Sequence, residues 1–91
     1  STTALRGLAR IAEAEGRSDD ALGYWRRLGE AVRPGDLPWY ESHYERARVL
    51  EAGGRAKASC ELLEGLRPAM PGLADQELRT KLGELYDRVC G

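Results

Sequence analysis

Hydrophobic residues recur every three or four positions along most of the chain, a spacing that predicts α-helices. In the first third of the sequence they form two segments, at about 3–15 and 18–32, which are separated by Gly16 and Arg17. The residues that share a face are Leu5, Leu8, Ala9 and Ala12 in the first segment and Ala21, Trp25, Leu28 and Val32 in the second. We expect a helical hairpin in which the alanines let the two helices approach closely and Trp25 fills the core beside them.

Prolines and glycines divide the rest of the chain into three more helical segments. We expect them at about 38–52, 55–66 and 75–89, with loops at 34–38 and 68–72. The apolar residues of the last segment lie on one face, within an arc of about 100°. They are Leu78, Leu82, Leu85, Tyr86 and Val89. Charged residues cover the remaining faces, so this segment suits a capping helix at the end of an array.

The second hairpin repeats the first at an offset of 38 residues. The alignment places EAEGRSDDALGYWRRL, residues 13–28, on EAGGRAKASCELLEGL, residues 51–66. Upstream, Ala9 falls on Ala47, and in the last segment Leu82 and Gly83 take the places of Leu8 and Ala9. A hairpin that recurs every 36 to 38 residues is typical of a helical-repeat array, in which each unit packs mainly on its neighbours.

At these positions the chain resembles the tetratricopeptide repeat (TPR) family. The matching residues are Leu5, Leu8, Ala9, Ala12, Gly16, Ala21, Trp25 and Leu28, then Ala47, Leu50, Gly54, Ser59, Leu63 and Leu66, then Leu82, Gly83 and Tyr86. The resemblance implies one all-α domain over residues 1–91, with repeats at about 2–35 and 38–70 and a capping helix at about 75–89. His43 and Arg46 stand where the family has large apolar residues, so other helical-hairpin repeats remain an alternative.

The resemblance also implies where a partner would bind. In TPR proteins the first helix of each hairpin lines a groove that receives a peptide or a partner helix. The corresponding positions are Arg6, Arg10 and Glu13, then Glu41, Tyr44, Arg48 and Glu51, then Glu77, Thr80, Glu84 and Arg88. Three of these arginines could converge on a carboxylate ligand, or the glutamates could pair with them internally, which we favour. Tyr44 is a candidate interface anchor.

The first segment carries apolar residues outside its core face. Ala4 and Ile11 lie about 100° away from the stripe that is expected to face the second segment. This placement indicates further repeats upstream, so the chain would be the C-terminal fragment of a longer protein. Alternatively, the same residues could mediate self-association as a homodimer, or be scattered surface residues.

The charge balance and the motifs narrow the functional classes. Fourteen Lys and Arg face fifteen Asp and Glu, which argues against nucleic acid as a partner, and no segment is apolar enough to be a membrane span. No phosphate-binding loop, nucleophile elbow or metal-ligand cluster is recognisable, so we expect neither an enzyme nor a cofactor or metal. The predicted function is protein–protein interaction through the groove or an exposed end. The alternative is a non-catalytic scaffold or regulatory domain of a larger enzyme or transcription factor.

Three residues with reactive side chains remain. Cys60 and Cys90 match no compact zinc motif and are expected to be free thiols. His43 is expected to be exposed, because neither neighbouring glutamate shares its helical face. The absence of a recognisable signal peptide or membrane span favours a cytoplasmic location.

Overall fold

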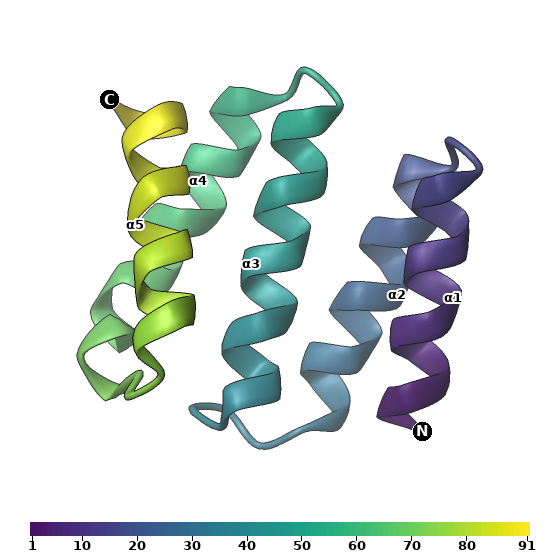
Figure 1. The fold of residues 1–91 in the computed structure, drawn as a ribbon, viewed down its shortest axis with the longest axis horizontal. Coiled ribbons are helices and arrows are strands. Elements are labelled where there is room, and N and C mark those ends of the chain that lie inside the picture. Colours follow the sequence, from purple (N-terminus) through teal and green to yellow (C-terminus); the bar gives the residue numbers. More distant parts are fainter.

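The computed structural model describes all 91 residues, and its regular structure is entirely helical (Figure 1). The helices are α1 (Thr2–Ala14), α2 (Ser18–Ala31), α3 (Leu37–Ala52), α4 (Ala56–Leu66), the 3-10 helix η1 (Arg67–Gly72) and α5 (Gln76–Cys90). The predicted all-α class is confirmed, although the expected loop at 68–72 is wound into η1. No helix combines the length and the apolar character that crossing a membrane requires.

The helices form two layers (Figure 1). Helices α1, α3 and α5 stand side by side in one layer, and α2 and α4 lie behind them. Helices α1 and α2 form the first hairpin and α3 and α4 the second, while α5 packs on α4 and α3. The two chain termini lie at opposite ends of the array. The expected arrangement of two hairpins followed by a single helix is therefore confirmed.

The turns inside the two hairpins have the same geometry. Gly16 and Gly54, which the 38-residue offset aligns, have φ angles of 76° and 77°. Glycine adopts this left-handed conformation without a Cβ clash, and it ends each helix in the same way. In both turns the next residue donates its backbone N–H to a carbonyl five positions back, from Arg17 to Ala12 at 2.8 Å and from Arg55 to Leu50 at 2.9 Å.

Aligned residues are also buried alike. The equivalent pairs that are buried in both hairpins are Ala9 and Ala47, Trp25 and Leu63, and Leu28 and Leu66. The first set forms a core with Val49 between α1, α2 and α3, and the second belongs to a core between α3, α4 and α5. The internal repeat seen in the sequence is thus a repeat of packing.

Two details of the predicted packing are wrong. Leu8 was expected on the core face of α1, but its side chain is 44% exposed. On α5 the fully buried residues are Leu82 and Leu85, which correspond in burial to Ala9 and Ala12 at an offset of 73 residues rather than 74. Because one residue turns a helix by about 100°, this single step decides which side of α5 faces the core.

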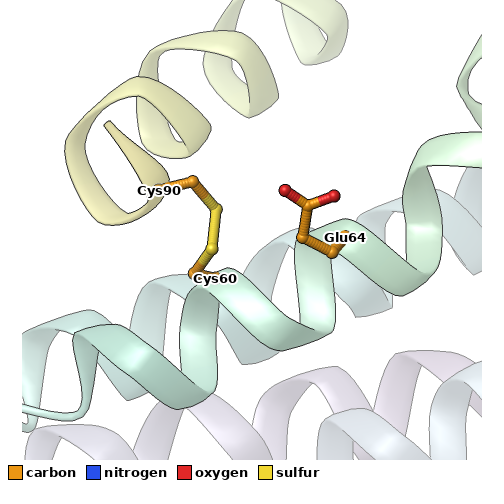
Figure 2. A group of neighbouring side chains, drawn as sticks. All are labelled: Cys60, Glu64 and Cys90. Atoms are coloured by element: carbon orange, nitrogen blue, oxygen red, sulfur yellow. A yellow bond between two sulfur atoms is a disulfide. The ribbon is translucent and has the colours of Figure 1, made fainter.

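The cysteines are not free. Cys60 on α4 and Cys90 at the end of α5 form a disulfide, with their Cα atoms 5.1 Å apart (Figure 2). The prediction of two free thiols is therefore wrong. The pair is separated by 30 residues in the sequence, and it meets only because α5 returns along α4 after η1.

Candidate functional site

The face formed by α1, α3 and α5 carries paired charges. Arg6 on α1 donates two hydrogen bonds to Glu41 on α3, at 3.2 and 2.6 Å. Further along the same two helices the charges are reversed, and Arg48 on α3 donates to both carboxylate oxygens of Glu13, at 2.9 and 2.6 Å. Bidentate pairs of this kind fix both side chains as well as their charges.

Glu45 joins these two pairs into a network. Its carboxylate accepts a hydrogen bond from Arg48 at 2.8 Å, and it lies 3.6 Å from a guanidinium nitrogen of Arg10. Only 8% of Glu45 is exposed, which is sustainable for a carboxylate because two arginines surround it. Sequence reasoning did not place Glu45 in the groove. Opposite charges recur 35 residues apart at 6/41, 10/45 and 13/48, and this spacing could have indicated it.

Helix α5 continues the pattern with one further pair. Arg88 donates to both carboxylate oxygens of Glu51, at 2.9 and 3.1 Å. Glu51 and Arg88 repeat the pairing of Glu13 and Arg48, because Glu51 is the aligned equivalent of Glu13. We refer to the pairs Arg6–Glu41, Arg10–Glu45, Glu13–Arg48 and Glu51–Arg88 as the ion-pair ladder.

The remaining candidates on α5 make local contacts. Glu77 pairs with Lys81 one turn later, at 3.3 Å, and the Thr80 hydroxyl donates to the Gln76 carbonyl of its own helix at 3.0 Å. Glu84 is exposed. The structure therefore brings Glu51 and Arg88 together across helices, while Glu77 and Thr80 stay engaged within α5.

The ladder is fully ionised at neutral pH. The hydrogen bonds from Arg48 lower the pKa of Glu13, and the bonds from Arg88 lower the pKa of Glu51. In turn, the hydrogen bonds to Glu41 raise the pKa of Arg6. The arginines that could have formed a carboxylate clamp are thus already paired internally. Arg10 also lies over the Trp25 ring, 5.4 Å from its centroid, and covers that part of the core.

A cavity of about 330 Å³ opens on this face between the three helices. Its apolar lining comes from Leu37, Tyr44 and Leu78, and Tyr44 is half-buried because it also packs against the core. The charged residues of its lining are Arg10, Glu41, Glu45, Asp75, Glu77 and Lys81. The groove thus offers an apolar floor with carboxylates around it.

The outer face of α1 has no partner within the chain. Ile11 is 54% exposed and Leu8 is 44% exposed, and Ala4 is exposed as well. These residues are three and four positions apart, so they line one side of the helix, which we call the α1 stripe. The sequence placed Ala4 and Ile11 outside the core correctly, but it assigned Leu8 to the opposite face.

His43 is half-buried rather than exposed. Its Nδ1 lies 2.9 Å from the Trp39 carbonyl oxygen, and its ring centroid is 4.4 Å from that of Trp39. Burial lowers the pKa of the imidazole, which favours the neutral form. The prediction of an exposed histidine is wrong because this side of α3 is covered by Trp39.

Comparison with protein-family models, with curated proteins and with solved structures gave no match. The function is therefore argued from the groove and the α1 stripe.

Proposed function

We propose that this chain is a TPR-like protein-interaction module that holds a peptide segment of a partner protein in the groove across α1, α3 and α5. The observation that carries the proposal is the cavity between these helices, where Leu37, Tyr44 and Leu78 offer apolar contacts. Binding sites commonly combine such an apolar floor with a few placed polar groups. Aromatic side chains such as Tyr44 are frequent anchors of interfaces.

The partner segment is expected to present an apolar side chain next to a lysine or arginine. Half of the exposed Leu37 side chain is open to such an anchor, and Glu77 and Asp75 stand at the same cavity. An acidic ligand is disfavoured because Arg6, Arg10 and Arg48 are already engaged by glutamates.

A selection from a random peptide library tests this proposal. We expect enriched peptides to combine an apolar residue with a cation, and we expect Glu77→Lys to weaken their binding. Glu61→Lys is the matched control, because Glu61 is an exposed glutamate on α4, away from the groove cavity. Peptides that bind both variants as tightly as the parent, or whose amide shift changes map away from α3 and α5, would refute the groove as the binding site.

The α1 stripe supports a second candidate, self-association. Leu8 and Ile11 expose a continuous apolar strip that neither hairpin covers, and such strips are frequent at interfaces. Light scattering over a dilution series tests this candidate. A dimer that dissociates on dilution and is abolished by Ile11→Glu would support it, whereas a monomer at every concentration would exclude it.

A further inference from the structure

Three potential metal ligands meet between α4 and α5. Cys60 and Glu64 are one turn apart on α4, and Cys90 reaches them from the end of α5 (Figure 2). Their ligand atoms all lie within 4.8 Å of one another. Figure 2 shows the Glu64 carboxylate on the same side of α4 as the disulfide. Two cysteine sulfurs and a carboxylate oxygen are ligand types that zinc accepts.

We propose that reduction of the Cys60–Cys90 disulfide creates a Zn²⁺ site formed by both thiolates and Glu64. An external dithiol reductant supplies two electrons and two protons, so the S–S bond becomes two thiols and the reductant becomes a disulfide. Each thiol then loses its proton to solvent when Zn²⁺ binds, because the thiolate is the ligand. A water molecule completes a four-coordinate shell.

The backbone geometry suits such a site. With Zn–S bonds of about 2.3 Å, two sulfurs of a tetrahedral site lie about 3.8 Å apart. The Cα atoms of Cys60 and Cys90 are 5.1 Å apart, so rotation of the two side chains can bring the sulfurs to this separation without moving the helices. Both cysteines are half-buried and Glu64 is exposed, which leaves a path for the ion from solvent.

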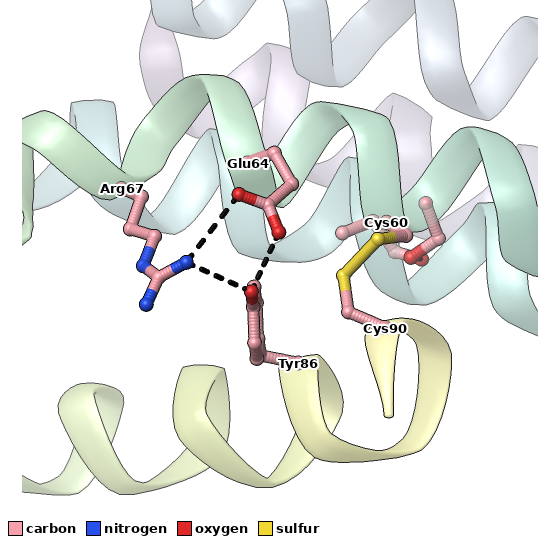
Figure 3. The surroundings of a disulfide bond; sticks show 7 residues. Cys60, Glu64, Arg67, Tyr86 and Cys90 are labelled. Carbon is pink, nitrogen blue, oxygen red and sulfur yellow. Dashed lines mark hydrogen bonds and ion pairs between the residues drawn. A yellow bond between two sulfur atoms is a disulfide. The ribbon is translucent and has the colours of Figure 1, made fainter.

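Neighbouring side chains supply an outer shell (Figure 3). The Tyr86 hydroxyl donates a hydrogen bond to Glu64 at 2.5 Å, and Arg67 donates to the Tyr86 oxygen at 3.0 Å. Hydrogen bonds of this kind orient carboxylate ligands in metal sites. The charges also balance, because Zn²⁺ with two thiolates and one carboxylate carries one negative charge and Arg67 lies 3.6 Å from Glu64.

The test uses the whole chain, reduced with a dithiol that is then removed without oxygen, and titrated with Co²⁺ as a spectroscopic probe and then with Zn²⁺. We expect thiolate-to-cobalt absorption and tetrahedral ligand-field bands in the reduced protein, bleached by Zn²⁺, and neither signal in the oxidised protein. Glu64→Gln should weaken Zn²⁺ binding at least about tenfold. Glu61→Gln, a change at another exposed glutamate of α4, should leave the affinity unchanged.

Two results would overturn the proposal. One is a cobalt spectrum of the reduced protein that matches that of Cys90→Ser, since the site would then not use both sulfurs. The other is a Glu64→Gln affinity equal to that of the parent. Circular dichroism covers the case in which reduction loosens α5: Zn²⁺ should then restore helicity in the reduced parent and not in the Cys60→Ser/Cys90→Ser variant, and failure to restore it would also count against the site.

Discussion

The pair between Glu13 and Arg48 allows the ion-pair ladder to be tested energetically. We consider Glu13→Gln, Arg48→Met and the double variant, since these changes remove charge while keeping most of each side chain's length. In the structure the pair has two hydrogen bonds, at 2.9 and 2.6 Å, and the side chains are 27% and 31% exposed. It is therefore better ordered than a surface pair but still reached by solvent.

The expected magnitude follows from this intermediate position. Fully exposed pairs contribute about 0.2–1 kcal/mol, whereas breaking a buried pair costs about 3–5 kcal/mol. With solvent screening at both side chains, we expect a coupling free energy of about 1 kcal/mol between Glu13 and Arg48. Arg48→Met alone should cost about 2 kcal/mol, because it also leaves the nearly buried Glu45 with one cation fewer.

Urea denaturation followed by circular dichroism measures each free energy of unfolding. The matched control is a cycle at Glu77 and Lys81, an exposed pair within α5, for which we expect only about 0.2–0.5 kcal/mol. High salt should reduce both couplings, because the Debye length falls to about 3 Å at 1 M. A Glu13–Arg48 coupling below about 0.3 kcal/mol, the usual error of additivity, would refute the reasoning and leave the arginines available to an acidic ligand.

Three further predictions concern stability. Trp25→Ala should lower the free energy of unfolding by about 3–5 kcal/mol, measured by urea denaturation, because the side chain is fully buried; a parent-like midpoint would contradict its place in the core. Reducing the Cys60–Cys90 disulfide should lower it by about 3.5 kcal/mol through release of the 30-residue loop, with the double serine variant insensitive to reductant. Burial lowers the pKa of His43 below its ordinary 6.5, so the unfolded chain takes up the proton first and stability should fall as the pH drops through 6.5; this step should vanish in His43→Gln.

The features that the sequence predicted well are local ones. Helix positions follow from apolar spacing and from breakers such as Gly16 and Gly54, which act within one turn of the chain. The core role of Trp25 follows from the same spacing, because the residue lies on the only continuous apolar face of its helix. Such patterns need no knowledge of how the helices are rotated against one another.

Errors arose where the rotation of a helix or the return of the chain decides the contact. Leu8 and Ala9 are neighbours on α1, yet one is 44% exposed and the other fully buried, so a small error in helix orientation exchanges their roles. The disulfide depends on α5 returning along α4, which the spacing of Cys60 and Cys90 does not encode. His43 was misjudged because nothing in its own helical pattern indicates that Trp39 covers it.

The ladder shows why a repeat in the sequence identifies equivalent residues but not their partners. The 38-residue offset aligns Glu13 with Glu51, and both accept hydrogen bonds from an arginine of the next helix in the layer. The partners are Arg48 and Arg88, at separations of 35 and 37 residues, because a contact between neighbouring helices depends on their stagger as well as on the repeat length. Since the same pair recurs at successive interfaces of the layer, these charges belong to the packing of the array. Recognition of a partner is then left to the side chains that the ladder does not engage, above all Tyr44 and the apolar floor around it.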